Sequence, residues 1–164
     1  MHQSKPSDPY QVAHELLESA LHLYFERNAY WAALHLAGAA EELLGKLLRE
    51  KEGTPYLDFM QQIMMEAWNK LTSEGRDIKT IDGKPMSPKS IAAFFNSAKN
   101  HVKHSIVPAT YNIRTEARDM LWRALSNYGG LQEKEPSVPD ASDLMERLYN
   151  ECVQVVLKEP AEPV

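Results

Sequence analysis

Apolar residues recur along most of the chain at intervals of three and four positions, which is the spacing of one face of an α-helix. The first run follows Ser7-Asp8-Pro9, where a capping side chain precedes a proline that suits a first helical turn. It predicts a helix over 8–27. Two further runs predict helices over 28–51 and 56–73, with Gly53-Thr54-Pro55 as the break between them.

The second half of the chain shows the same spacing after a polar loop at 74–88. Asp82-Gly83 in this loop is a turn signal, and the segment 78–81 before it is compatible with a short strand of a small hairpin. Three more helices are then expected. The first begins at Ser87-Pro88 and runs to His104, the second covers 110–128 and ends at Gly129-Gly130, and the last covers 140–158.

These elements predict an all-α fold. We expect an antiparallel bundle of four to five core helices, with the shorter helix at 56–73 as an extra element. The methionines and tryptophans are expected in its core. A single domain would cover 8–158, and 1–7 and 159–164 would be flexible tails.

The composition and charge of the chain exclude several classes of protein. The chain has 164 residues, of which 43% are hydrophobic and 25% charged, as is typical of a globular domain. Its formal charge of −5 excludes a generally basic nucleic-acid binder but allows a local basic patch. No apolar run approaches the ~18 residues of a membrane span, and the first residues lack the apolar core of a secretory signal. Since Cys152 is the single cysteine, no internal disulfide can form. We therefore expect a cytoplasmic protein with no membrane contact.

The charge is unevenly distributed along the sequence. No acidic residue occurs between Asp82 and Glu116. The basic residues and histidines of this island are Lys84, Lys89, Lys99, His101, Lys103, His104 and Arg114. A basic island in an acidic chain favours an anionic ligand such as RNA or a nucleotide. Alternatively, it complements the acidic first and last helices through salt links, and the sequence leaves both interpretations open.

The segment 96–104 lies inside this island and combines several polar groups. On a helix, Asn96, Asn100, Lys103 and His104 would lie away from the apolar stripe, with Lys99 and His101 at its two edges. The resulting surface would carry amides, ammonium groups and an imidazole. A histidine near a helix C-terminus is favoured in its protonated form, which suits a proton donor or a phosphate partner but also a solvated cap.

This layout resembles the HEPN superfamily (higher eukaryote and prokaryote nucleotide-binding domains). The family signature is Arg, usually followed by a polar residue, with a His four to six residues later at the end of the third core helix. Residues 99–104 match this signature with one departure, because Lys99 stands in place of the Arg. The segments 35–44 and 116–128 also resemble family helices, so that the resemblance covers about residues 8–130.

The resemblance implies a homodimer whose two motifs face each other and cleave RNA without a metal. His104 would act on the 2′-hydroxyl or the leaving oxygen, Asn100 would orient the substrate or the His, and Lys99 would replace the Arg. An ammonium cannot bind two phosphate oxygens as a guanidinium does, so we expect weak catalysis or none. Other expected ligand contacts are Asn96, Lys103, His101, Glu41 and Arg114. Family members are often paired with a nucleotidyltransferase or an antitoxin, which are the partners implied here.

Two further carboxylates bear on this prediction. Glu41 lies at the edge of the apolar stripe of the second helix, where it either reaches the Lys99–His104 cluster or turns to solvent at the rim. Glu42 is expected in solvent. No metal or cofactor is expected, because the chain has no Glu-x-x-His pair of the kind that di-metal helical bundles use.

Three functions remain as alternatives. The first is a helical dimer that binds RNA, a nucleotide or a partner protein through the 96–104 surface, with little or no catalysis. The second is a metal-independent, toxin-like endoribonuclease that uses His104 and Lys99. The third is a structural module for protein interaction, in which the motif has lost its chemistry.

Overall fold

The computed structural model describes residues 7–76, 79–80, 83–104 and 112–158, with the side chains of 102–104 and 155–158 left aside. These ranges contain seven helices and no strand, which confirms the all-α prediction. The helices are α1 (Pro9–Phe25), α2 (Tyr30–Glu50), α3 (Tyr56–Ser73), α4 (Pro88–Phe95), α5 (Ser97–His104), α6 (Ile113–Gln132) and α7 (Asp143–Lys158).

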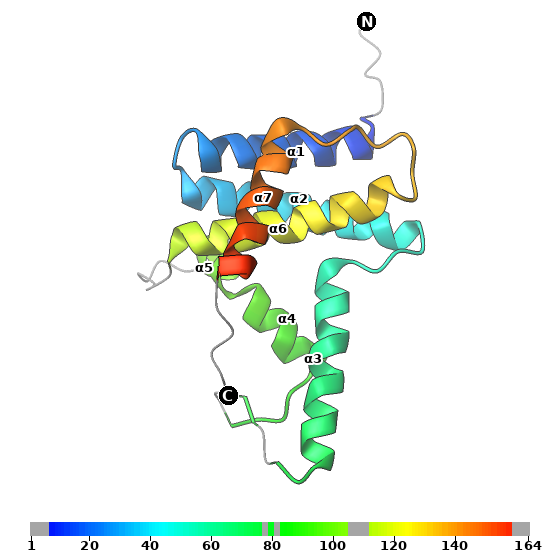
Figure 1. The fold of residues 1–164 in the computed structure, drawn as a ribbon, viewed down its shortest axis with the longest axis vertical. Coiled ribbons are helices and arrows are strands. Elements are labelled where there is room, and N and C mark those ends of the chain that lie inside the picture. The colour runs from blue at the N-terminus through cyan, green and yellow to red at the C-terminus, as the bar shows by residue number, and fades with distance from the viewer. Residues whose placement is uncertain (1–6, 77–78, 81–82, 105–111, 159–164) are drawn as a thin grey trace, which may run out of the picture.

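Three long helices form the body of the molecule. α1, α2 and α6 lie side by side, with α7 crossing over them (Figure 1). Their facing stripes meet in one core, where Leu17, Leu34 and Leu121 are fully buried. The burial of these apolar faces is what stabilises the bundle, since helices of this length are marginal on their own.

The start of α1 and its connection to α2 follow from local sequence. The Asp8 carboxylate accepts a hydrogen bond from the amide of Tyr10 at 3.0 Å, and Pro9 occupies the first turn, as predicted. Asn28 adopts a positive φ of 51° between the two helices, a conformation that asparagine tolerates better than most residues. This tight turn sends α2 back along α1.

α3 and α4 extend away from the body, and we call this part, residues 56–95, the arm (Figure 1). α4 begins with a capping box, in which the Ser87 hydroxyl accepts from the amide of Ser90 and the Ser90 hydroxyl accepts from the amide of Ser87. α3 has 18 residues and none of them is buried. The arm is thus built from well-formed helices that contribute little to the core.

Two predicted helix boundaries are wrong. The helix expected from Ser87 to His104 is two helices, because α4 ends at Phe95 and α5 begins at Ser97. Gly129-Gly130 does not end α6, which continues to Gln132. Glycine costs a helix roughly 1 kcal/mol relative to alanine. This cost is offset by full burial of Leu131 and by the close fit of Gly130 against Leu48, where a Cβ would lie 3.3 Å from Cδ2.

Two more expectations concern the segment 78–81 and the positions of the tryptophans and methionines. Ile78 and Ile81 of the expected strand lie outside the described residues, and Lys79 and Thr80 between them are not in a strand. The expected core role of the tryptophans and methionines is wrong in part. Trp31 is 46% exposed, and within the described residues the buried methionines are Met120 and Met145. The other described methionines lie on the arm. An apolar side chain alone therefore did not indicate a position in the core.

Candidate functional site

The break between α4 and α5 is held by an arginine from another helix. Arg123 of α6 donates from Nη1 to the carbonyl oxygen of Phe95 at 2.8 Å and from Nη2 to Oδ1 of Asn96 at 3.1 Å. Carbonyl groups at a helix end lack partners within the helix, and here a side chain supplies one. Asn96 is therefore turned toward the bundle and is only half-exposed, although its place in the sequence predicted a position on the outer surface.

Lys99, which stands at the Arg position of the resemblance, is buried. Its side chain is 4% exposed, and Nζ lies 2.7 Å from Oε1 of Glu42 and 3.8 Å from Oε2 of Glu41. The stem of Lys99 passes over Gly38 of α2, where a Cβ atom would come within 2.4 Å of Cδ. Glycine at this position is what allows the lysine to reach the two carboxylates.

Glu41 is a buried partner of this cluster and not a rim residue. It is 6% exposed, and its Oε1 accepts from Nη2 of Arg123 at 3.0 Å. The Glu42 carboxylate is exposed, as expected for this residue, but it is also the nearer ion-pair partner of Lys99. Two carboxylates and two cations thus form one network whose formal charges cancel. Such pairing is what makes buried charges tolerable, because an isolated one would be very costly.

A buried amide extends the network to the start of the arm. Asn127 of α6 is fully buried and donates from Nδ2 to the backbone oxygen of Glu41 at 3.3 Å. Its Oδ1 accepts from the amide of Tyr56, the first residue of α3, at 2.7 Å. Side chains from α2, α5 and α6, with the amide of α3, are therefore joined in one set of hydrogen bonds and ion pairs. We call this set the polar network; its members are Glu41, Glu42, Asn96, Lys99, Arg123 and Asn127.

The other predicted site residues are dispersed. Asn100 is exposed on the outer side of α5, and His101 is half-buried beside it. Lys103 and His104 occupy the last turn of α5, but their side chains lie outside the described residues. Arg114 is not brought to the network, because its exposed guanidinium lies 3.9 Å from Glu151 of α7.

A cavity of ≈ 520 Å³ lies beside the first turn of α5. Its lining combines aromatic rings with two carboxylates, those of Glu116 and Asp119. Burial raises the pKa of Glu116, and the neighbouring charge of Asp119 raises it further. The lining residues are Tyr56, Phe94, Phe95, Ser97, Glu116, Asp119, Met120, Trp122 and Arg123. With two carboxylates at its wall, this cavity does not favour a phosphate.

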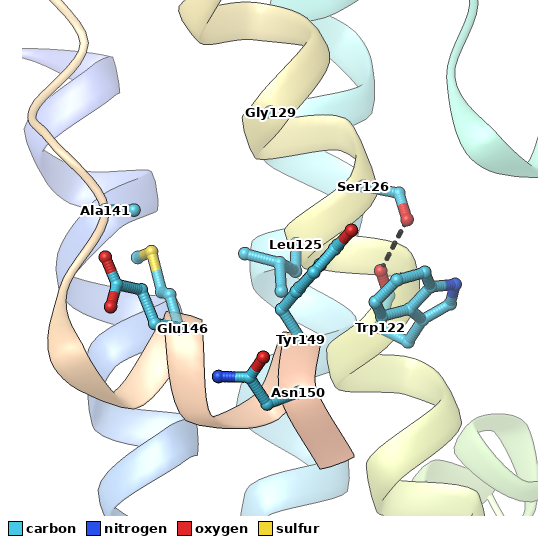
Figure 2. A pocket seen from close by; sticks show the side chains of 9 residues that line it. Trp122, Leu125, Ser126, Gly129, Ala141, Glu146, Tyr149 and Asn150 are labelled. Atoms are coloured by element: carbon cyan, nitrogen blue, oxygen red, sulfur yellow. Dashed lines mark hydrogen bonds between the residues drawn. The ribbon is translucent and has the colours of Figure 1, made fainter. Parts of the chain in front are cut away.

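A second cavity of ≈ 500 Å³ lies between α6 and α7 (Figure 2). Trp122 and Tyr149 stand next to each other there, with ring centroids 6.0 Å apart. Ser126 does not present its hydroxyl to a ligand, because it donates to the carbonyl oxygen of Trp122 at 2.8 Å. The lining is mostly apolar, and it offers no pair of groups suited to acid–base or nucleophilic catalysis.

Sequence reasoning missed Arg123 and Asn127. Both fall on the apolar stripe of α6, since Arg123 is three residues after Met120 and Asn127 is four after Arg123. A polar residue on a buried stripe needs a partner, and Glu41 on the stripe of α2 supplied one. Comparing polar interruptions on the two stripes could have identified this pair.

Neither metal-ligand groups, helix lengths nor likeness to known proteins assigns a function to this chain. Within the part of the chain that the structure describes, no group of three or more His, Cys, Asp or Glu side chains could hold a metal ion. No described helix is long and apolar enough to cross a membrane. The resemblance to HEPN domains stays a prediction from the sequence. No protein-family model matches the chain, and no curated protein or solved structure matches it significantly.

Proposed function

We propose that this protein is a HEPN-like helical module for protein interaction, in which the motif positions hold the helices together and catalyse no reaction. The observation that carries the proposal is the position of Lys99. Its ammonium is buried and bound by two carboxylates of the same chain. The cation that would contact a phosphate is therefore already used inside the fold.

The energetics support this role. For Lys99 to bind a phosphate, its ammonium would have to leave Glu42 and Glu41, and the buried Glu41 would lose part of its compensation. Because Glu42 is exposed and Glu41 keeps its bond to Arg123, the expected cost is about 1–3 kcal/mol. The adjacent cavity carries the carboxylates of Glu116 and Asp119 beside one guanidinium, that of Arg123, so it offers an anion no net positive charge.

The surface of the arm supports protein binding. Five large apolar side chains of the described residues are exposed, and three of them belong to the arm: Phe59 at 49%, Ile63 at 42% and Phe94 at 66%. The other two are Trp31 of α2 and Tyr149 of α7. Large apolar side chains grouped on an otherwise polar protein are typical of interaction sites. The partner we propose is another protein chain, and a homodimer is the simplest case.

A second candidate function is the binding of RNA or a nucleotide on the outer side of α5. It is favoured by the exposed amide of Asn100 and by the absence of acidic residues between positions 83 and 115 of the sequence. In this case Lys103 and His104, and not Lys99, would supply the positive charge. The binding would depend strongly on salt, as phosphate contacts do.

Mutation of Lys99 tests whether this lysine has a structural role or contacts RNA. We expect Lys99→Met to lower the free energy of unfolding by about 1–3 kcal/mol, because Glu41 and Glu42 lose a hydrogen-bonded cation. The same change should leave affinity for a fluorescent single-stranded RNA unaltered at ~150 mM salt, a typical physiological ionic strength. Chemical denaturation and fluorescence anisotropy measure the two effects. A direct RNA contact by Lys99 predicts the opposite pattern, with weaker RNA binding and little change in stability.

A cleavage assay in EDTA tests the catalytic alternative. Wild-type protein, His104→Ala and Lys99→Arg would each be incubated with a structured RNA. We expect no cleavage by any of them, because the Lys99 position is enclosed by Glu41, Glu42 and the α2 backbone at Gly38. Cleavage by the wild type that disappears in His104→Ala would contradict the proposal and establish a ribonuclease.

A further inference from the structure

The apolar stripe of α3 is only partly covered, because five of its seven members are half-buried and two, Ile63 and Ala67, are exposed. Its members repeat at helical spacing, yet none of them is buried. α4 contacts α3 from one side, and the opposite side of α3 points away from α4 (Figure 1). Part of the stripe lines a hollow together with Met86. The stripe consists of Leu57, Met60, Ile63, Met64, Ala67, Trp68 and Leu71. An amphipathic helix gains most of its stability from packing of this face, so a further surface is expected to meet it.

The arm carries two apolar features, a projection and a hollow. The first is a ridge, formed by Phe59 and Ile63, which are four residues apart and therefore one turn apart on the same side of α3. The second is a cleft of ≈ 750 Å³ between α3 and α4. Its lining is mainly apolar and includes Met64, Met86 and Ile91, together with the exposed Phe94. A volume of this size is within the range that accommodates bulky groups.

We infer that a second copy of this chain docks on the arm, with the ridge of each copy in the cleft of the other. A two-fold interface uses the same patch on both subunits, so the patch must contain both a projection and a place to receive it. The arm meets this requirement within residues 56–95. The inference rests on the proposed interaction function and gives its partner and its surface.

The charge of the arm favours a second copy over other occupants. Residues 56–95 contain five acidic and five basic side chains, so their net charge is 5 − 5 = 0, and the whole charge of −5 belongs to the rest of the chain. Two arms can therefore meet without net repulsion, whereas RNA would find no net attraction. A membrane-surface helix is usually rich in Lys and Arg, but α3 carries Lys70 as its one basic residue.

The methionines of the arm suit an interface of irregular shape, and two of them, Met64 and Met86, line the cleft. Four of the seven methionines of the sequence, Met60, Met64, Met65 and Met86, belong to the arm. Methionine is unbranched and polarizable, and it fits partners of irregular shape. Aromatic anchors such as Phe59 and Phe94 supply much of the energy in protein interfaces.

Light scattering during size-exclusion chromatography tests the inference. At ~50 µM, which lies well above the Kd of a specific complex, we expect the wild type to have the mass of two chains. The ridge variant Phe59→Glu/Ile63→Glu and the cleft variant Phe94→Glu should each have the mass of one chain, with unchanged helical circular dichroism. Trp31→Glu is the matched control, because Trp31 is equally exposed at 46% but lies on α2. It should remain a dimer.

Mixing the two variants provides a sharper test. The ridge variant keeps its cleft and the cleft variant keeps its ridge, so a mixed pair regains one of the two contacts that each variant alone has lost. Native mass spectrometry should therefore find mixed dimers in the mixture but no dimer in either variant alone. If wild type dimerises and mixing restores nothing, the two shapes are not each other's partners and the inference is wrong.

Further outcomes separate this inference from the proposed function. A monomeric wild type at ~100 µM, or a dimer that Trp31→Glu breaks and the arm variants leave intact, would overturn arm pairing. The absence of RNA cleavage would still leave the proposed function in place. Conversely, an arm-dependent dimer that cuts RNA through His104 would refute the proposed function and leave arm pairing intact.

Discussion

α2 and α3 are amphipathic helices of similar length, with 21 and 18 residues, but their surroundings differ completely. α2 buries ten residues between α1 and α6, whereas α3 buries none. Both helices were equally evident from the spacing of apolar residues. The comparison shows that this spacing identifies the apolar face of a helix but does not tell what covers it.

The same difference predicts unequal stability within the molecule. The free energy of unfolding resides mainly in the bundle, where apolar side chains and the polar network are removed from water. The arm has few buried contacts, so it should open at a lower free energy than the bundle. Paired substitutions in the two regions measure this difference directly.

The largest effect is expected for Arg123→Met. Methionine has a similar length but leaves the buried Glu41 carboxylate without its guanidinium partner and the Phe95 carbonyl without its donor. We expect the free energy of unfolding to fall by about 3–5 kcal/mol in urea denaturation. Arg114→Met is the control, because its guanidinium is exposed and lies 3.9 Å from Glu151, and it should change stability by under ~1 kcal/mol. Equal effects of the two changes would refute the structural importance of the network.

A pair of apolar truncations compares the bundle with the arm. Leu121 of α6 is fully buried, so Leu121→Ala should cost about 2–5 kcal/mol through lost burial and the cavity that it leaves. Ile63 of α3 is 42% exposed, and Ile63→Ala should cost under ~1 kcal/mol at concentrations where the chain is monomeric. Thermal denaturation followed by circular dichroism provides the measurement. A large loss for Ile63→Ala would mean that the arm is packed more firmly than its exposure indicates.

Two glycine substitutions, compared as a pair, are expected to have smaller effects than Arg123→Met and Leu121→Ala. Gly38→Ala places a methyl group 2.4 Å from Cδ of the buried Lys99, so the lysine has to shift, and we expect a loss of about 1–3 kcal/mol. Gly129→Ala meets nothing within 4 Å, and it should stabilise α6 by roughly 0.5 kcal/mol because alanine favours the helix. The two melting temperatures should therefore move in opposite directions. Parallel shifts would show that Lys99 does not depend on the space at Gly38.

Much of the fold could be predicted from the sequence, because helix positions depend on local spacing and caps. The start of α1 at Asp8-Pro9 and the bounds of α3 followed from these signals. The break at Asn96 could not be predicted in this way. It depends on Arg123, which is 27 residues away in sequence and donates to the Phe95 carbonyl and the Asn96 side chain.

The candidate site was harder to predict than the fold. The sequence placed Lys99 at the edge of an outer polar surface, but the side chain is drawn inward by two carboxylates of α2. Which way a long flexible side chain turns depends on partners that only the tertiary structure provides. Glu41 was recognised as a residue that needs a partner, whereas Arg123, which pairs with it, was not.

The close approach of Lys99 to Gly38 has a consequence for how this chain can change during evolution. A side chain at position 38 would occupy the space that the lysine stem fills, so the two positions are not free to vary separately. We expect homologous sequences that carry a larger residue at position 38 to carry a shorter one at position 99. An ancestor with the longer and wider arginine at position 99 would have had to hold it on a different path, or to keep glycine at position 38.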